Sequence, residues 1–132
     1  MTTDYGIDLV AYDPEARHSF SIQVKTSAMG RAERRPDWKV KEGKSKAADL
    51  FAFVLKNQQG EVWYLSQTEL KKYTRLYNHQ LALTFYRTDA PPNRLTETDM
   101  ARFKDLGGLE SFVRDWRKSM KASAAKITSG RS

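Results

Sequence analysis

Residues 6–26 read GIDLVAYDPEARHSFSIQVKT and contain the pattern of a strand, a turn and a second strand. The first part, residues 6–12, is rich in β-branched and aromatic residues, which favour a strand. Residues 13–17 begin with Asp-Pro, a pair typical of a turn. Residues 18–26 then alternate between apolar and polar side chains, which is the period of a strand with one buried face. We therefore predict an antiparallel hairpin whose turn is centred on residues 15 and 16.

The predicted hairpin brings three polar side chains together. With the turn centred on residues 15 and 16, Asp8 lies opposite Gln23, and cross-strand partners share one face of a sheet. Lys25 follows two residues later on the same strand and therefore on the same face. A carboxylate and an amide oxygen can bind Mg²⁺, which lowers the pKa of bound water, and a lysine can stabilise the charge that develops when water attacks a phosphodiester. The pattern predicts metal-dependent phosphodiester hydrolysis by these three residues.

The same alternation allows a simpler interpretation. Ser21, Gln23 and Lys25 form the polar side of an alternating strand, and such a side commonly faces solvent for solubility alone. A register shift of one residue would also move Asp8 to the other face. The residues by themselves leave both interpretations open.

Residues 6–27, GIDLVAYDPEARHSFSIQVKTS, resemble the core of the PD-(D/E)xK superfamily of restriction-endonuclease-like nucleases. The resemblance is to the branch in which the second motif reads Q-x-K. It continues more weakly through residues 49–73, DLFAFVLKNQQGEVWYLSQTELKKY. It implies an α/β fold with a mixed β-sheet flanked by helices, a βαβ crossover after the hairpin, and endonuclease activity on DNA.

The resemblance also implies a role for each residue of the motif. Asp8 takes the position of the metal-binding aspartate, Gln23 that of the second acidic ligand, and Lys25 that of the catalytic lysine. The carbonyl of Val24 is implied as a further ligand of Mg²⁺ or Mn²⁺, and the hydroxyl of Ser27 is implied to lie near the phosphate. Because Gln23 is neutral, we expect the metal to be held weakly.

Many members of the family also carry a glutamate on a helix before the first strand. Only five residues precede Gly6, so most of that helix is expected to be missing. Asp4, or a partner subunit in a homodimer or a larger assembly, would then supply the missing carboxylate. The alternative is a catalytically inactive DNA-binding or assembly subunit on the same fold.

The charge of the chain favours a polyanion as partner, with DNA the first candidate. Its 132 residues include 23 Lys and Arg against 16 Asp and Glu, a formal charge of +7. Residues 31–46 have a net charge of +4 and residues 114–131 of +5, which suits contacts with a DNA backbone. Ordinary solvated charge, or a binding protein for another polyanion or an acidic protein, is the alternative. The predicted DNA contacts are Ser27 and the basic residues Arg31, Arg34, Arg35, Lys39, Lys41, Lys44 and Lys46.

Composition excludes several classes of site. The chain has no cysteine, so it has no disulfide, thiolate zinc site or cysteine nucleophile, which fits a cytoplasmic location. Its two histidines are too few for a multi-histidine metal cluster. The longest apolar run, residues 50–55, is far below the ~20 residues of a membrane span, and residues 1–10 lack the pattern of a secretory signal. No membrane partner is expected.

The rest of the sequence predicts a single domain over residues 1–120 and a basic, flexible tail over 121–132. Residues 27–48 show no sustained period and are predicted as a long basic loop with a short extended piece at residues 38–41. Trp38 would either anchor this loop or stack on a base. The later strands are expected to join the hairpin in one mixed sheet. The predicted elements are a buried central strand at 49–56, strands at 61–65 and 81–87, and helices at 67–78, 97–106 and 109–120, with Gly107 and Gly108 ending the second helix.

Overall fold

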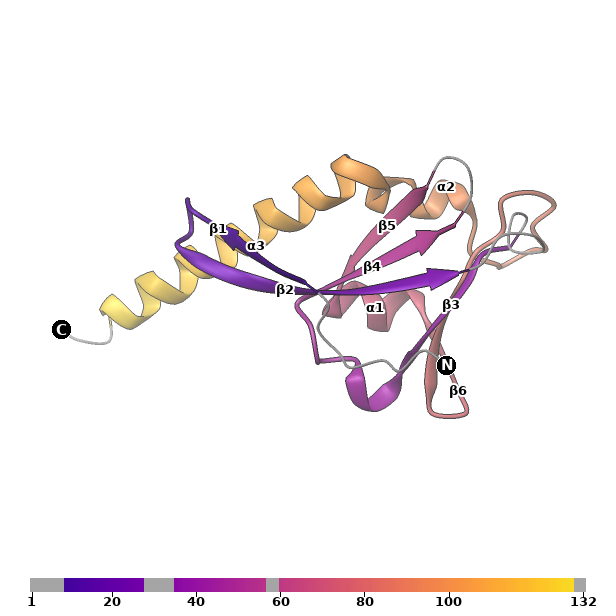
Figure 1. Ribbon diagram of the computed structural model, residues 1–132, viewed down its shortest axis with the longest axis horizontal. Helices are drawn as coiled ribbons and strands as arrows, with labels where there is room; N and C mark the ends of the chain where they lie inside the picture. The colour runs from indigo at the N-terminus through magenta and orange to yellow at the C-terminus, as the bar shows by residue number, and fades with distance from the viewer. Residues whose placement is uncertain (1–8, 28–34, 57–59, 130–132) are drawn as a thin grey trace.

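The computed structural model describes residues 9–27, 35–56 and 60–129, with side chains as far as residue 122. Within these ranges the chain is a mixed α/β fold with two β-sheets (Figure 1). The large sheet contains, in spatial order, β1 (Leu9–Asp13), β2 (His18–Ser27), β4 (Leu50–Leu55) and β5 (Glu61–Ser66). The small sheet contains, in spatial order, β3 (Asp37–Lys41), β7 (Gln80–Thr84) and β6 (Arg75–Tyr77).

The β1–β2 hairpin has the predicted register. Leu9 pairs with Ile22 and Asp13 with His18, so the described pairs are centred on residues 15 and 16. The turn is closed by the backbone N–H of Arg17, which donates to the carbonyl of Asp13 at 2.8 Å. The alternation of residues 18–26 therefore predicted the strand, and the Asp-Pro turn predicted its pairing.

The predicted mixed sheet is present as the large sheet, in which β2 and β4 are parallel. The later strands do not all join it, because β3, β7 and β6 form a separate antiparallel sheet. On β3, Trp38 and Val40 are buried and alternate with three exposed residues, so this strand has one apolar face to cover. That face packs toward the large sheet. The parallel strands β2 and β4 are therefore connected through β3 and a 3₁₀ turn, η2 (Glu42–Lys44), among the described residues, where the family resemblance implied a helix.

The core lies between the two sheets and is largely aromatic. Phe51, Phe53 and Trp63 of the large sheet have no exposed surface, and Trp38 of the small sheet is 2% exposed. The Trp38 ring centroid lies 5.7 Å from those of Phe53 and Trp63, and its indole N–H donates to the carbonyl of Val54 at 3.0 Å. Trp38 therefore anchors the segment after β2, and this alternative of the sequence prediction is confirmed. Strand β4 is buried on both faces, as predicted.

Helix α1 (Gln67–Tyr73) begins at the predicted residue and ends five residues earlier than predicted. Its start is fixed by a capping box in which Ser66 and Glu69 each accept a hydrogen bond from the other's backbone N–H. The chain then enters β6 and reverses at Asn78 and His79, whose φ angles are 50° and 61°. His79 thus lies in a turn and not at a helix end.

The predicted helix at 97–106 is divided into α2 (Glu97–Met100) and a 3₁₀ turn, η3 (Ala101–Phe103), before α3 (Asp105–Ser129) begins. Gly107 and Gly108 lie inside α3, so the prediction that they end a helix is wrong. A Cβ at Gly108 would lie 1.9 Å from the carbonyl oxygen of Phe103, so glycine is required by this close approach. The predicted tail boundary at residue 121 is also wrong, because α3 continues to Ser129.

Helix α3 lies along the β1–β2 hairpin (Figure 1), where Phe20 contacts the rings of Phe112 and Trp116. A bidentate ion pair adds to this contact. The Arg117 guanidinium donates to both carboxylate oxygens of Asp13, at 2.7 and 2.8 Å, and Asp13 is only 5% exposed. The hydrogen bonds from Arg117 lower the pKa of Asp13 against the opposing effect of burial.

The Asp13–Arg117 pair predicts acid sensitivity. Since the pKa of Asp13 in the folded state lies below its ordinary value of 3.8, the pair stabilises the fold above that value and loses its contribution as the pH falls through the lowered pKa. We expect Asp13→Asn to lower the melting temperature at pH 7 and to flatten its decline below about pH 4. Melting curves across pH for this variant and wild type test this; parallel curves would contradict it.

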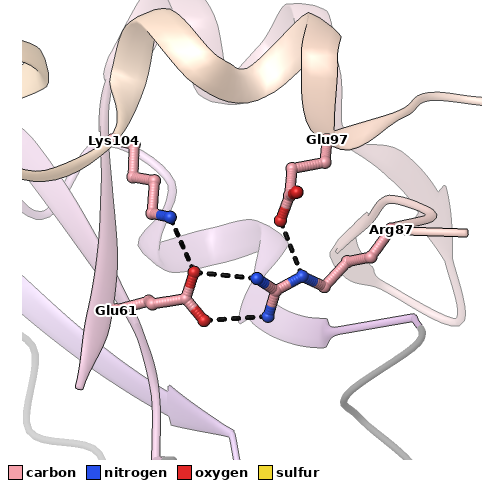
Figure 2. A network of polar contacts seen from close by, with 4 residues as sticks. All are labelled: Glu61, Arg87, Glu97 and Lys104. Atoms are coloured by element: carbon pink, nitrogen blue, oxygen red, sulfur yellow. Dashed lines mark hydrogen bonds and ion pairs between the residues drawn. The ribbon is translucent and has the colours of Figure 1, made fainter. Parts of the chain in front are cut away.

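A second network joins β5 to the segments that follow β7 (Figure 2). Glu61 is buried, and its carboxylate accepts two hydrogen bonds from Arg87, at 2.8 and 2.9 Å, while Lys104 Nζ lies 2.7 Å away. Arg87 Nε also pairs with Glu97 at 2.6 Å. These contacts hold α2 and η3 against the large sheet. Removing one partner would be destabilising, because it would leave a buried charge uncompensated.

In the described part of the chain, no helix has both the length and the apolar character that crossing a membrane requires.

Candidate functional site

The structure brings Gln23 and Lys25 together on one face of β2. Gln23 pairs with Phe51 and Lys25 with Phe53 on the parallel strand β4. Residues paired across neighbouring strands point to the same side of a sheet, so both polar side chains share the face that carries the aromatic core. Phe20, on the opposite face, packs against α3.

Gln23 has no exposed surface, and Lys25 is half-buried. The interpretation of this side of β2 as a solvent face is therefore wrong for Gln23. Gln23 and Lys25 instead lie at one end of the core, beside Phe51 and Phe53, and form what we call the polar end of the core. Burying an amide and part of an ammonium side chain is costly, so solubility does not explain this placement.

Asp8, the predicted metal-binding aspartate, lies outside the described residues. It directly precedes Leu9 in the sequence, and Leu9 pairs with Ile22, the neighbour of Gln23. Val24 lies between Gln23 and Lys25 and pairs with Ala52. The proposed use of its carbonyl as a metal ligand stays a prediction.

Asp49 is an acidic residue near this face that the sequence reasoning missed. Its carboxylate accepts hydrogen bonds from the backbone N–H of Ser21 at 2.9 Å and from the Ser21 hydroxyl at 3.2 Å. Ser21 lies two residues before Gln23 and so on the same side of β2. The one signal in the sequence is an acidic residue directly before the buried strand at 50–55, and its meaning depends on the parallel pairing of β2 with β4.

The donor set for a divalent cation is incomplete in the described part of the chain. No group of three His, Cys, Asp or Glu side chains suited to a metal is present among residues 9–27, 35–56 and 60–129. Of the predicted ligands, the structure describes Gln23 and Val24, and both offer neutral oxygens. Mg²⁺ in proteins is usually held through one or two carboxylates, so these two residues alone do not fit it. A metal site built from the predicted ligands would need the carboxylate of Asp8 as well.

The predicted DNA-binding residues do not form one loop beside this face. Lys39 and Lys41 lie on the outer, exposed side of β3, facing away from the core. Arg35 and Lys46 are exposed. Lys44, the last residue of η2, and Ser27, the last residue of β2, are half-buried. The two remaining residues, Arg31 and Arg34, lie outside the described ranges. The described basic residues thus lie mainly over the small sheet, and Gln23 and Lys25 lie on the large one.

Comparison of the chain with models of known protein families, with curated proteins and with solved structures finds no match.

Proposed function

We propose that this protein binds DNA and hydrolyses its phosphodiester bonds with Mg²⁺ or Mn²⁺, using Asp8, Gln23 and Lys25. The observation that carries the proposal is the placement of Gln23 and Lys25 side by side on the buried face of β2. The hairpin register, which matches the one that the motif needs, supports it further. The resemblance to PD-(D/E)xK nucleases rests on these same residues.

Each residue has a role in the proposal. The Gln23 amide oxygen and the Asp8 carboxylate would hold the cation, which would polarise the phosphate and lower the pKa of a water molecule. The Lys25 ammonium stabilises the negative charge that develops on the phosphoryl oxygens. The aromatic side chains beside it exclude water from one side, which strengthens this electrostatic interaction.

The test is incubation of the protein with supercoiled plasmid in Mg²⁺, in Mn²⁺ and in EDTA. We expect nicked or linear product with either metal and none in EDTA. DNA binding, measured in parallel, should weaken steeply between about 50 and 200 mM salt because neutralised phosphates release counterions. Salt-sensitive binding without cleavage in either metal would favour a catalytically inactive DNA-binding subunit, and absence of both would overturn the proposal.

A further inference from the structure

The outer face of the small sheet carries a groove that the proposed hydrolytic site does not use. The groove has a volume of about 600 Å³ and is lined by residues of β3, β6, β7 and the segments beside them. Six of its residues are arginines or tyrosines: Arg35, Arg75, Arg94, Tyr73, Tyr77 and Tyr86. The buried side chains of the same sheet, among them Trp38 and Leu83, point to the other side, toward the core.

The charge of the groove favours an anion. Among the described residues that line it, three arginines are exposed, and the one carboxylate is that of Asp37. The Asp37 carboxylate accepts a hydrogen bond from the hydroxyl of Thr84 at 2.8 Å. Arginine presents a planar fork of donors that matches phosphate oxygens, so three arginines in one groove suit a chain of phosphates.

The tyrosines add flat surfaces for stacking. Tyr77 is 72% exposed, so its ring is accessible to a ligand. The guanidinium of Arg35 lies 5.8 Å from the centroid of the Tyr86 ring and donates to its hydroxyl at 3.4 Å. Alternating aromatic rings and arginines are how proteins bind single-stranded nucleic acid, with bases on the rings and phosphates on the cations.

We propose that this groove binds a short single-stranded stretch of nucleic acid. Duplex DNA is a poorer fit because its bases are stacked inside the helix and cannot reach Tyr77. The choice of nucleic acid as the ligand rests on the proposed function. The existence of the groove does not, because the groove and the face with Gln23 and Lys25 are on different sheets. The groove would hold a strand separately from the residues that cleave it.

The test is binding of a fluorescent oligothymidine of about 15 nucleotides, followed by anisotropy in EDTA. Tyr77→Ala should weaken binding at least about fivefold, because one stacked base is lost, and Tyr77→Phe should bind like wild type because the ring remains. Arg75→Ala should weaken binding more than Arg17→Ala, which removes the same charge from the exposed turn between β1 and β2, outside both basic clusters. Unchanged melting temperatures show that each variant is folded.

Three outcomes would overturn the inference: wild-type affinity in Tyr77→Ala, equal losses in Arg75→Ala and Arg17→Ala, or equally tight binding of polyglutamate or of a duplex. The double variant Asp8→Ala/Lys25→Ala separates the two proposals. Oligothymidine binding that survives in this variant and falls in Tyr77→Ala supports the groove, whether or not the wild type cleaves plasmid. Cleavage by the wild type together with unaltered binding in Tyr77→Ala overturns the groove alone.

Discussion

Replacing Lys25 with alanine is expected to slow plasmid cleavage by at least about a hundredfold, because a positioned donor for developing negative charge typically contributes that much. The fold should persist, since Lys25 is half-buried at the polar end of the core and makes no part of the aromatic cluster. Initial rates with Mg²⁺ and melting curves of the same preparations measure both effects.

Lys71→Ala is the matched control for this prediction. Lys71 is exposed on α1, so its replacement removes the same charge from a residue that takes no part in the proposed chemistry. Asp8→Ala should lose cleavage as Lys25→Ala does. A Lys25→Ala protein that cuts at the wild-type rate would show that this residue is not catalytic.

Gly108→Ala is expected to destabilise the fold by about 2 kcal/mol or more, because overpacked positions typically cost 1–3 kcal/mol. The added Cβ would meet the backbone carbonyl of Phe103 at 1.9 Å, and a backbone atom cannot rotate away. The start of α3 would have to move off η3, which also disturbs Lys104 in the network with Glu61. Denaturant unfolding of the variant measures the loss.

Gly107→Ala is the matched control, one residue away on the same helix. A Cβ there meets nothing within 4 Å, so the substitution should stabilise α3 by up to about 1 kcal/mol through helix propensity. Equal effects of the two substitutions would show that the approach of Phe103 does not decide the need for glycine at position 108.

Local patterns predicted the parts of the fold that local forces decide. The alternation in residues 18–26 predicted β2, and the Asp-Pro turn predicted its register. The helix start predicted at residue 97 matches that of α2, where Thr96 accepts a hydrogen bond from the N–H of Asp99. The burial of residues 50–55 was also predicted, because a strand with a nearly continuous apolar sequence is buried on both faces.

The parts that the sequence did not predict depend on contacts between distant residues. Gly107-Gly108 resembles a helix end, and only the approach of Phe103 shows that the second glycine serves packing. The small sheet forms because Asp37–Lys41 pairs with Gln80–Thr84, about forty residues later, so no local period indicates it. The same holds for Asp49 and Ser21, which are 28 residues apart and meet through the parallel pairing of β2 and β4.

The burial of Gln23 was likewise hidden from the sequence. An alternating strand shows which residues share a face, and it does not show whether the polar face meets solvent or another layer. Here the second sheet covers that side, so the Gln-x-Lys motif lies at the end of a core. Burial makes the motif more informative, because placing a neutral amide in the core costs free energy that solubility does not explain.

The measurement that tests the metal site most directly is the Mg²⁺ dependence of the melting temperature of Gln23→Glu. A glutamate at this fully buried position provides the acid that PD-(D/E)xK nucleases usually have in this motif, and its charge is costly without a cation. We predict that Mg²⁺ raises the melting temperature of Gln23→Glu by several degrees more than that of wild type, because a ligand that binds only the folded state stabilises it, and that adding Asp8→Ala removes the effect. Melting temperatures that do not respond to Mg²⁺ in either protein would contradict a metal site at Asp8 and Gln23.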